Sequence, residues 1–306
     1  MSTSPKEPRA KARGGLQLNL KGRNGIMSNI SVSVIVPAFN EEKVIAGFVK
    51  ELLSLKKANW EIIIVDDGST DKSAELILEN DITLLRHQYN RGYGAAIKTG
   101  IAKAKNDVIA IVDADGTYPL SELPHLLEFM GSFDMVVAER KSGVSAARIP
   151  AKWVLKKLAE YLSNSKIPDL NSGFRVFKKS IAERFLRILP DGFSFTTTIT
   201  LAMLTNGYSV KYVPINYQKR IGKSKIHPIN DTLAFLQLII RTVLYFNPLK
   251  IFIPMSLMLF CASISVLLLS RFLLGYVMDV TVVMLFISGI QVLAIGMIAD
   301  LIDKRI

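Results

Sequence analysis

Two carboxylates separated by one residue stand at the end of a short apolar run. Asp113 and Asp115 follow Val108–Val112 directly, with Ala114 between them. Carboxylates at i and i+2 that leave a strand can converge on one hard divalent cation, such as Mg²⁺ or Mn²⁺. Such a cation neutralises a diphosphate and so stabilises it as a leaving group. Asp-x-Asp also occurs in solvated turns, so the position at a strand end is what favours the metal interpretation.

A second acidic segment, Asp66–Thr70, also follows an apolar run, Ile62–Val65. In one interpretation Asp67 points across the edge of a sheet toward a base or ribose. In the other, Ser69 or Thr70 caps the helix that follows, which requires no ligand. The sequence leaves both interpretations open.

A glycine-containing segment, Asn90–Ala96, precedes a predicted helix and carries Gly92 and Gly94. Glycines at this place let backbone N–H groups approach a phosphate at the start of the helix. A dinucleotide-binding fingerprint requires a third glycine, and Ile97 holds that place. The segment also follows the third predicted strand rather than the first, so the pattern excludes a nicotinamide-dependent enzyme.

These polar segments lie within a β/α alternation that begins at Ser31. Short β-branched runs are typical of buried parallel strands, and the carboxyl edge of such a sheet is where ligands bind. The expected strands are Val32–Val36, Ile62–Val65, Thr83–Leu85, Val108–Val112 and Asp134–Ala138. The expected helices between them are Glu41–Leu55, Ser73–Leu78 and Gly94–Ala104. The predicted fold class is therefore α/β with a mainly parallel central sheet.

Two uncharged runs near the C-terminus, Ile251–Ser270 and Val280–Ala299, are long enough to cross a bilayer. A helix rises about 1.5 Å per residue and the hydrocarbon core is about 30 Å thick. Lys250 precedes the first run, and Lys304 and Arg305 follow the second. The positive-inside rule then predicts a multi-pass protein of the cell membrane whose termini and preceding domain are cytoplasmic.

The composition of the chain, above all its net charge, indicates which class of partner the protein binds. The formal net charge is +12, which suits anionic partners. A domain tied to an anionic membrane surface explains this charge more simply than a nucleic acid does, because no nucleic-acid recognition motif is present. The one cysteine, Cys261, lies in the first expected span, and the three histidines are scattered. This excludes a disulfide framework and a thiolate metal site.

The remaining segments flank the predicted domain. Residues 1–30 are basic without a hydrophobic period, so we expect disorder, and either Met1 or Met27 can be the start. Arg148–Ser165 predicts a basic amphipathic helix that lies on the membrane surface or covers the sheet. Asp231–Asn247 predicts a second amphipathic helix at the interface. The expected boundaries are 1–30, a domain over 31–230, a juxtamembrane helix over 231–248 and two membrane helices over 249–303.

Several segments together carry a resemblance to a known family. They are Pro37–Glu42, Asp66–Ser69, Gly92–Gly94 and Asp113–Asp115. In this order and spacing they resemble the GT-A fold of family 2 glycosyltransferases. Asn171–Arg175 and Arg220–Lys225 are similar to motifs of the dolichyl-phosphate mannose synthase and polyprenyl-phosphate glycosyltransferase group. The resemblance covers about Val32 to Pro248, and its motifs are weak singly and specific together.

The resemblance implies a role for each matching residue. The nucleotide sugar would be bound by Pro37, Ala38, Asn40, Glu42, Asp67, Gly92, Gly94, Asp113, Ala114 and Arg140. A Mg²⁺ or Mn²⁺ cofactor would be held by Asp113, Asp115 and Thr117, and the acceptor by Arg175, Arg220, Ser224 and Lys225. Catalysis would depend on Asp115, Arg220 and Lys225.

The chain departs from the family pattern at two places. Many members have a glutamine two residues after the second metal aspartate, where this chain has Thr117. Many also have a glutamate in a later helix, and the segment Gly192–Thr198 contains no acid. These departures affect the expected metal geometry and the donor or acceptor preference.

The resemblance implies an inverting, metal-dependent transfer of a hexose from a nucleotide-diphosphate sugar to a dolichyl or undecaprenyl phosphate at the cytoplasmic membrane face. The second pKa of a phosphate monoester is about 6, so this acceptor is largely ionised and requires charge neutralisation more than a general base. UDP-glucose, UDP-N-acetylglucosamine and GDP-mannose all fit as donors, membrane lipids are expected partners, and a homo-oligomer is compatible with the resemblance. The alternatives are a processive polysaccharide synthase, which would require a Gln-x-x-Arg-Trp segment and more spans, and a non-catalytic membrane scaffold that binds nucleotides.

Overall fold

The computed structural model describes residues 30–77, 81–141, 156–161, 163–192, 194–217, 247–276 and 278–303. Its strands are β1 (Val32–Ala38), β2 (Trp60–Asp66), β3 (Thr83–Arg86), β4 (Val108–Ile111), β5 (Met135–Arg140), β6 (Arg175–Lys178) and β7 (Val210–Ile215). Its α-helices are α2 (Ile45–Leu55), α3 (Tyr93–Lys103), α4 (Leu123–Leu127), α6 (Lys179–Phe185), α7 (Phe195–Thr205), α9 (Leu249–Leu269) and α10 (Asp279–Asp303). Short turns of other helix types are η2 (Leu120–Glu122), η3 (Glu128–Gly131) and η5 (Ser270–Leu274).

One seven-stranded sheet runs in the order β3-β2-β1-β4-β6-β5-β7. The strand β6 is antiparallel to both β4 and β5, and the other described pairings are parallel. This confirms the predicted α/β class with a mainly parallel sheet. Because β6 runs the opposite way, its first residue, Arg175, pairs with Ile111 at the carboxyl end of β4. The segment that enters β6 therefore lies at the same sheet edge as the residues that leave β4.

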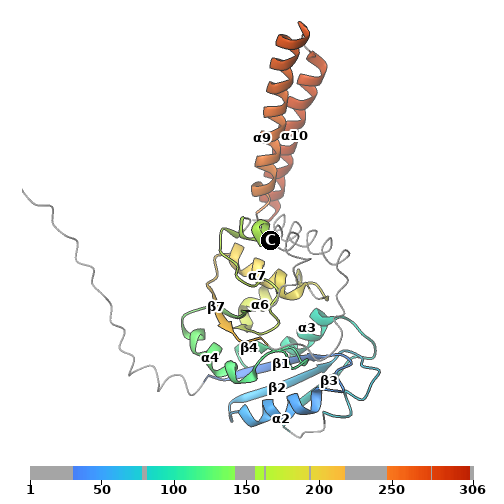
Figure 1. Ribbon diagram of the computed structural model, residues 1–306, viewed down its shortest axis with the longest axis vertical. Coiled ribbons are helices and arrows are strands. Elements are labelled where there is room, and N and C mark those ends of the chain that lie inside the picture. Colours follow the sequence, from blue (N-terminus) through green and yellow to red (C-terminus); the bar gives the residue numbers. More distant parts are fainter. Residues whose placement is uncertain are drawn as a thin grey trace, which may run out of the picture.

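Helices cover both faces of the sheet, because successive side chains of a strand point to opposite faces. Val34 and Val36 pack with Leu52 of α2 in one core, whereas Ile35 packs with Ile97 of α3 in the other. The first core also receives α4, and the second receives α6 and α7. Figure 1 shows α2 on the far side of the sheet and α6 and α7 between the sheet and the projecting pair α9 and α10.

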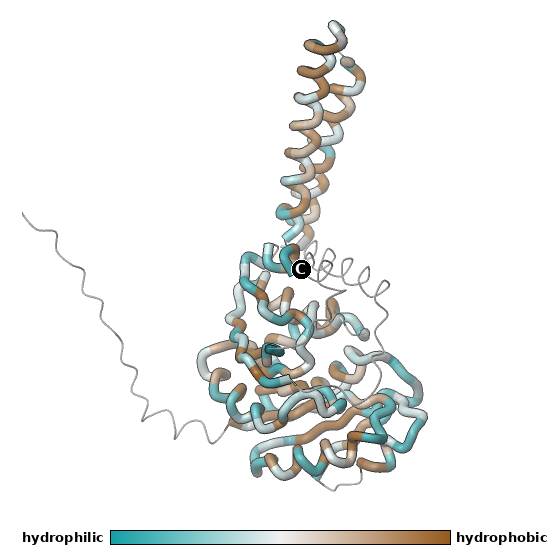
Figure 2. The backbone as a smooth tube through the Cα atoms, viewed as in Figure 1, coloured by the Kyte–Doolittle hydropathy of each residue, from teal (hydrophilic) through white to brown (hydrophobic). Residues whose placement is uncertain are grey.

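The helices α9 and α10 are long and apolar enough to cross a membrane, judged by length and composition. The apolar stretches cover Leu249–Leu273 and Asp279–Ile302 and contain both expected spans. Figure 2 shows hydrophobic residues along most of this hairpin, in contrast to the mixed surface of the sheet domain. This agrees with the two-helix hairpin of the predicted fold class.

Close contacts hold the hairpin together. The Ser256 hydroxyl donates to the Gly289 carbonyl at 2.8 Å, and Gly289 lies against the ring of Phe260. Gly296 lies in the same way against Phe252. Small residues allow this close approach, and they are common at the interfaces of membrane helices, where the hydrophobic effect does not drive helices together.

The base of the hairpin contacts the sheet domain. Ile251 of α9 packs on a cluster that includes Ala159 and, from α7, Leu201. The Lys250 ammonium donates to the Tyr161 carbonyl at 3.2 Å. The described part of the predicted helix Arg148–Ser165 is helical at residues 156–161 and 163, and it packs in this cluster with Leu201 of α7 and Tyr212 of β7.

One predicted helix is wrong over its described part. Residues 73–76 of the expected helix at Ser73–Leu78 form turns, and residue 77 is not helical. Asp71 and Ser73 bond to each other, and the Ser73 hydroxyl oxygen accepts the Glu41 N–H at 2.7 Å. Such local polar bonds compete with a helix. Residues 1–29, most of Asp231–Asn247 and the domain boundary near residue 230 lie outside the described residues.

Candidate active site

The loop that leaves β4 presents the two predicted carboxylates. One oxygen of Asp115 accepts the Thr117 N–H at 3.1 Å and the Thr117 hydroxyl at 2.6 Å. One oxygen of Asp113 accepts the Tyr93 hydroxyl at 2.8 Å. Ala114, between them, is buried. Both carboxylates are therefore held in place by the protein, one from the same loop and one from α3.

The segment that enters β6 closes the other side of Asp113. A Cβ on Gly173 would lie 2.0 Å from Oδ2 of Asp113, so only a glycine leaves room for this carboxylate. The Gly173 N–H donates to the hydroxyl of the buried Tyr118 at 2.8 Å. This backbone position is thereby fixed from the loop that follows Thr117.

Burial and the neighbouring negative charge of Asp115 raise the pKa of Asp113 to about 6. Two carboxylates that resist joint ionisation suit a divalent cation, which removes their repulsion. In the part of the chain that the structure describes, no group of three or more acidic, histidine or cysteine side chains could hold a metal. A Mg²⁺ or Mn²⁺ ion does not require such a group, because it can bind one or two carboxylates and complete its shell with phosphate oxygens and water.

The raised pKa of Asp113 predicts a pH-dependent affinity for Mn²⁺. Because the cation requires the ionised carboxylate, its affinity is expected to be constant well above pH 6 and to fall about tenfold per pH unit well below it. A titration of Mn²⁺ into the protein between pH 5 and pH 8 measures this. An affinity that does not change across that interval would contradict the assignment of Asp113.

Thr117 is completely buried, and its hydroxyl donates a hydrogen bond to the Asp115 carboxylate. The observed contact orients the carboxylate. The oxygen of a hydroxyl retains acceptor capacity while it donates, so the predicted role of Thr117 as a metal ligand stays a prediction.

Asp67 lies at the predicted sheet edge but is turned into the protein. Its carboxylate accepts the N–H groups of Arg91 and Gly92 at 2.9 and 2.8 Å, and it contacts Nδ1 of His87 at 2.7 Å. The side chain is buried. In this structure Asp67 organises the loop before α3, and its direct contact with a nucleotide stays a prediction.

The loops after β1 and β2 are tied together by polar bonds. The Ser69 hydroxyl oxygen accepts the Asn40 backbone N–H at 2.9 Å, and the side-chain amide oxygen of Asn40 accepts the Thr70 N–H at 2.9 Å. Ser69 therefore joins two loops, and the residues after Thr70 form turns in place of the helix that it was expected to cap. Pro37 and Ala38 are buried beneath these loops, whereas Glu42 is exposed.

Gly92 and Gly94 are required by a close approach within the protein. Gly92 has a φ of +102°, and a Cβ on Gly94 would lie 2.1 Å from the carbonyl oxygen of Pro190. The Ala95 N–H donates to the Asp191 carbonyl at 3.0 Å. The start of α3 is thus packed on the backbone of residues 190–192, and the expected phosphate contact there stays a prediction.

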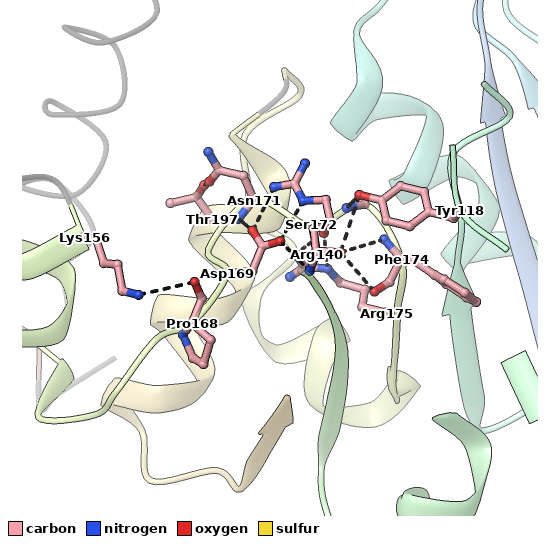
Figure 3. Close-up of polar contacts among 11 residues, drawn as sticks. Tyr118, Arg140, Lys156, Pro168, Asp169, Asn171, Ser172, Phe174, Arg175 and Thr197 are labelled. Carbon is pink, nitrogen blue, oxygen red and sulfur yellow. Dashed lines mark hydrogen bonds and ion pairs between the residues drawn. The ribbon is translucent and has the colours of Figure 1, made fainter. Parts of the chain in front are cut away.

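Arg140, at the end of β5, forms a bidentate ion pair. Its Nε and a terminal nitrogen donate to the two carboxylate oxygens of Asp169 at 2.6 and 2.8 Å, and the guanidinium lies 5.5 Å from the ring centre of Tyr217. Burial opposes this charge, but the bonds to Asp169 outweigh it and raise the pKa of Arg140. Asp169 also accepts the Asn171 N–H at 3.1 Å, within the network of Figure 3.

Arg175 has no exposed surface. Its guanidinium donates to the carbonyls of Ser172 and Thr196 and to the Thr200 hydroxyl. Figure 3 shows it beneath the segment that leads into β6. Burial lowers the pKa of Arg175 from its very high ordinary value. A direct contact with an acceptor would require Arg175 to leave these partners, so this placement does not support the predicted binding role.

The structure brings Asp113 and Asp115 together with Tyr93, Gly173 and Tyr118, and the sequence does not identify these three as site residues. Tyr93 lies in the Gly-Tyr-Gly motif and Gly173 in the Asn-Ser-Gly-Phe-Arg motif, so the motifs indicated the segments but not the contacts. The predicted acceptor residues Arg220, Ser224 and Lys225 lie outside the described residues.

Comparison with known proteins decides the family of this site. Residues 33–186 match the model of glycosyl transferase family 2, which is about half of the chain and includes both carboxylates. The chain belongs to glycosyl transferase family 2. It is therefore a glycosyltransferase. Residues 247–304 match the GtrB C-terminal hairpin, in agreement with α9 and α10.

Relatives of this glycosyltransferase include two with named activities. A dolichyl-phosphate hexose transferase of Haloferax volcanii is 25% identical over 218 residues, which cover 70% of this chain and 94% of the relative. A bactoprenol glucosyl transferase of Shigella phage SfV is 27% identical over 297 residues, which cover 90% of this chain and 94% of the relative.

A solved structure shares the fold. It is glucosyl-3-phosphoglycerate synthase from Mycobacterium tuberculosis, crystallised with Mn²⁺, UDP-glucose and phosphoglyceric acid. The TM-score is 0.59 at 16% identity, over 74% of this chain and 84% of that one. This likeness confirms the GT-A-like fold.

Proposed function

We propose that this glycosyltransferase moves a hexose from a nucleotide-diphosphate sugar to a polyprenyl phosphate, with inversion at the anomeric carbon. The observation that carries the proposal is the pair Asp113 and Asp115, held at the carboxyl end of β4 in a domain that rests on an apolar helical hairpin. The named relatives act on dolichyl phosphate and bactoprenol, which supports a lipid-borne acceptor.

Asp113 and Asp115 are the residues that would hold a Mg²⁺ or Mn²⁺ ion, with Thr117 orienting Asp115. When bound, the cation neutralises the charge that develops on the leaving diphosphate. The shared fold of a synthase crystallised with Mn²⁺ and UDP-glucose supports this type of cofactor and donor. The carboxylates contribute position, because each is fixed by at least one hydrogen bond before any ligand arrives.

Fixed positive charge near these carboxylates comes from two arginines. The positive charges of Arg140 and Arg175 both favour the ionised form of Asp113, and bonds within the protein hold each guanidinium. Charges that are oriented in advance stabilise a developing negative charge without reorganisation. We assign Arg175 this electrostatic role in place of direct acceptor binding.

The acceptor phosphate requires little assistance from a general base to act as a nucleophile. A phosphate monoester is largely ionised at neutral pH, so the site must overcome repulsion between two anions and align them for in-line displacement. We assign the acceptor phosphate to the basic segment with Arg220, Ser224 and Lys225, which precedes the hairpin in the sequence. The anchor then holds the sheet edge near the headgroups, where a polyprenyl phosphate carries its charge.

The same proposal places the sheet domain and both termini in the cytoplasm. Lys250 precedes α9, and Lys304 and Arg305 follow α10, so the positive-inside rule supports this orientation.

Removing the two basic acceptor residues tests the acceptor assignment. The double variant Arg220→Ala/Lys225→Ala is expected to raise the KM for polyprenyl phosphate by about a hundredfold or more, because each lost contact to a charged group is worth about 1.5–3 kcal/mol. Steady-state kinetics on both substrates measure this, with donor affinity expected to change less than threefold, roughly the effect of a distant surface charge. Equal loss of donor and acceptor affinity would contradict the assignment.

The proposed function is tested by a product assay. The purified full-length protein, in detergent with Mn²⁺, is incubated with polyprenyl phosphate and labelled UDP-glucose, UDP-N-acetylglucosamine or GDP-mannose. We expect label from one donor to enter the lipid fraction, with release of the nucleoside diphosphate. If no donor labels the lipid, the transferase proposal is wrong, and release of the diphosphate without labelled lipid would indicate another acceptor.

A further inference from the structure

We propose that Tyr93 is a positioning residue for the donor site. Its hydroxyl holds Asp113 in the orientation that binds the cation, and Asp67 in turn fixes the position of Tyr93. The inference rests on the proposed function in that it takes Asp113 as a ligand of the cation and donor. It gives Asp67 a role different from the nucleotide contact that its motif suggests.

The first observation is that Asp113 is confined on both of its oxygens. Oδ1 accepts the Tyr93 hydroxyl at 2.8 Å, and Oδ2 faces Gly173 so closely that a Cβ there would lie 2.0 Å away. Gly173 only excludes other orientations, because it offers Asp113 no side-chain donor. Tyr93 therefore supplies the directional hydrogen bond that selects one orientation.

The second observation is that the protein fixes Tyr93 from the preceding loop. The Asp67 carboxylate accepts the N–H groups of Arg91 and Gly92, the two residues directly before Tyr93. Gly92 adopts a φ of +102°, which other residues rarely tolerate. Asp67 thereby sets the direction in which the chain enters α3, and Tyr93 is the first residue of that helix.

The third observation is that the other side of this loop is also fixed. The Asp191 carbonyl accepts the Ala95 N–H at 3.0 Å, and Lys98 pairs with the Asp191 carboxylate at 2.8 Å. The start of α3 thus cannot shift without breaking bonds on both sides. A chain of contacts leads from Asp67 through Gly92 and Tyr93 to Asp113.

The chemistry of a phenol suits this position. A neutral hydroxyl donor orients a carboxylate without cancelling its charge, so the full charge remains for a cation. A lysine in the same place would compete with the cation. Outer groups that orient a ligand in this way usually change metal affinity by about 10- to 100-fold when they are removed.

The test compares Tyr93→Phe with wild type as full-length proteins. Tyr208→Phe is the matched control, because its hydroxyl accepts a bond from Arg184 at the surface. The free Mn²⁺ signal in electron paramagnetic resonance gives the affinity for Mn²⁺ in the presence of UDP. Tyr93→Phe is expected to weaken it about 10- to 100-fold. Tyr208→Phe is expected to leave it unchanged, and either variant is expected to lower the unfolding temperature of the metal-free protein by no more than about 10 °C, the cost of one lost hydrogen bond.

Two outcomes would overturn the inference. One is wild-type Mn²⁺ affinity in Tyr93→Phe. The other is a loss that appears only together with a fall in the unfolding temperature well beyond about 10 °C, which would indicate a general structural role. Because the readout requires no acceptor, a protein that binds Mn²⁺ as expected but never labels a lipid would refute the proposed function and leave this inference standing.

A second variant tests the part that concerns Asp67. Asp67→Asn keeps one acceptor oxygen but replaces the other with a donor, so it cannot accept from both Arg91 and Gly92 in the observed way. It is expected to weaken Mn²⁺ binding as Tyr93→Phe does, and the two changes combined are expected to cost less than the product of the separate losses. Lower affinity for UDP with unchanged Mn²⁺ affinity would instead show direct nucleotide contact by Asp67.

Discussion

Replacing Asp115 by alanine is expected to reduce sugar transfer by about a thousandfold, equivalent to about 4 kcal/mol of lost transition-state stabilisation. The reason is that Asp115 is one of two carboxylates that hold charge against the leaving diphosphate. Folding should not suffer comparably, because the substitution removes one of two neighbouring negative charges. Transfer of labelled sugar to lipid measures the effect, and the amount of protein in the membrane fraction measures folding.

Asp115→Asn is the matched control for this result. An asparagine keeps an oxygen that can accept the Thr117 N–H and hydroxyl, so the loop is retained while the charge is lost. We expect it to be nearly as inactive as Asp115→Ala. If Asp115→Asn were fully active, the loop geometry rather than the carboxylate charge would be what the reaction requires.

Gly173→Ala is the second change with a large expected effect. The added methyl group would lie 2.0 Å from Oδ2 of Asp113, and the carboxylate is the atom group able to move. Its movement would break the bond from Tyr93 and displace the first carboxylate of the pair. We expect transfer to fall by about a hundredfold, as for loss of a ligand's orienting partner, with a small change in stability.

The control for Gly173→Ala is Gly131→Ala. A Cβ on Gly131 would meet no atom within 4 Å, so this alanine is expected to leave transfer unchanged. Both variants are assayed for transfer and for Mn²⁺ affinity. If Gly173→Ala bound Mn²⁺ with wild-type affinity, displacement of Asp113 would not affect the cation, and Asp113 would not be one of its ligands.

The strands β1, β2 and β4 could be predicted from the sequence because they are short runs rich in β-branched residues and almost entirely buried. The strands β6 and β7 lack this signal. β6 begins with Arg175, a residue type rarely buried, and its guanidinium is accommodated by carbonyl and hydroxyl acceptors that come from distant segments. β7 contains Pro214, which lies in an edge strand, where a missing N–H is tolerated.

The sequence predicts which segments of the chain form the candidate site, but not the contacts between them. The sequence places Asp113 and Asp115 at a strand end, but the groups that orient Asp113 come from the start of α3 and from the segment that precedes β6. Gly173 reaches Asp113 only because β6 is antiparallel to β4, and that pairing has no local signature. For the same reason, the sequence could not show that Arg175 points inward or that Asp169 pairs with Arg140.

The central proposal is transfer of sugar to a lipid phosphate at a site where Asp113 and Asp115 hold a divalent cation. The direct measurement is labelled sugar entering polyprenyl phosphate with the purified protein, first with Mn²⁺, then with excess EDTA, then after Mn²⁺ is restored. We predict labelled lipid in the first and third conditions and a loss of about a hundredfold or more in the second. Undiminished labelling in EDTA would contradict the role of the cation, and no labelled lipid in any condition would contradict the proposed reaction.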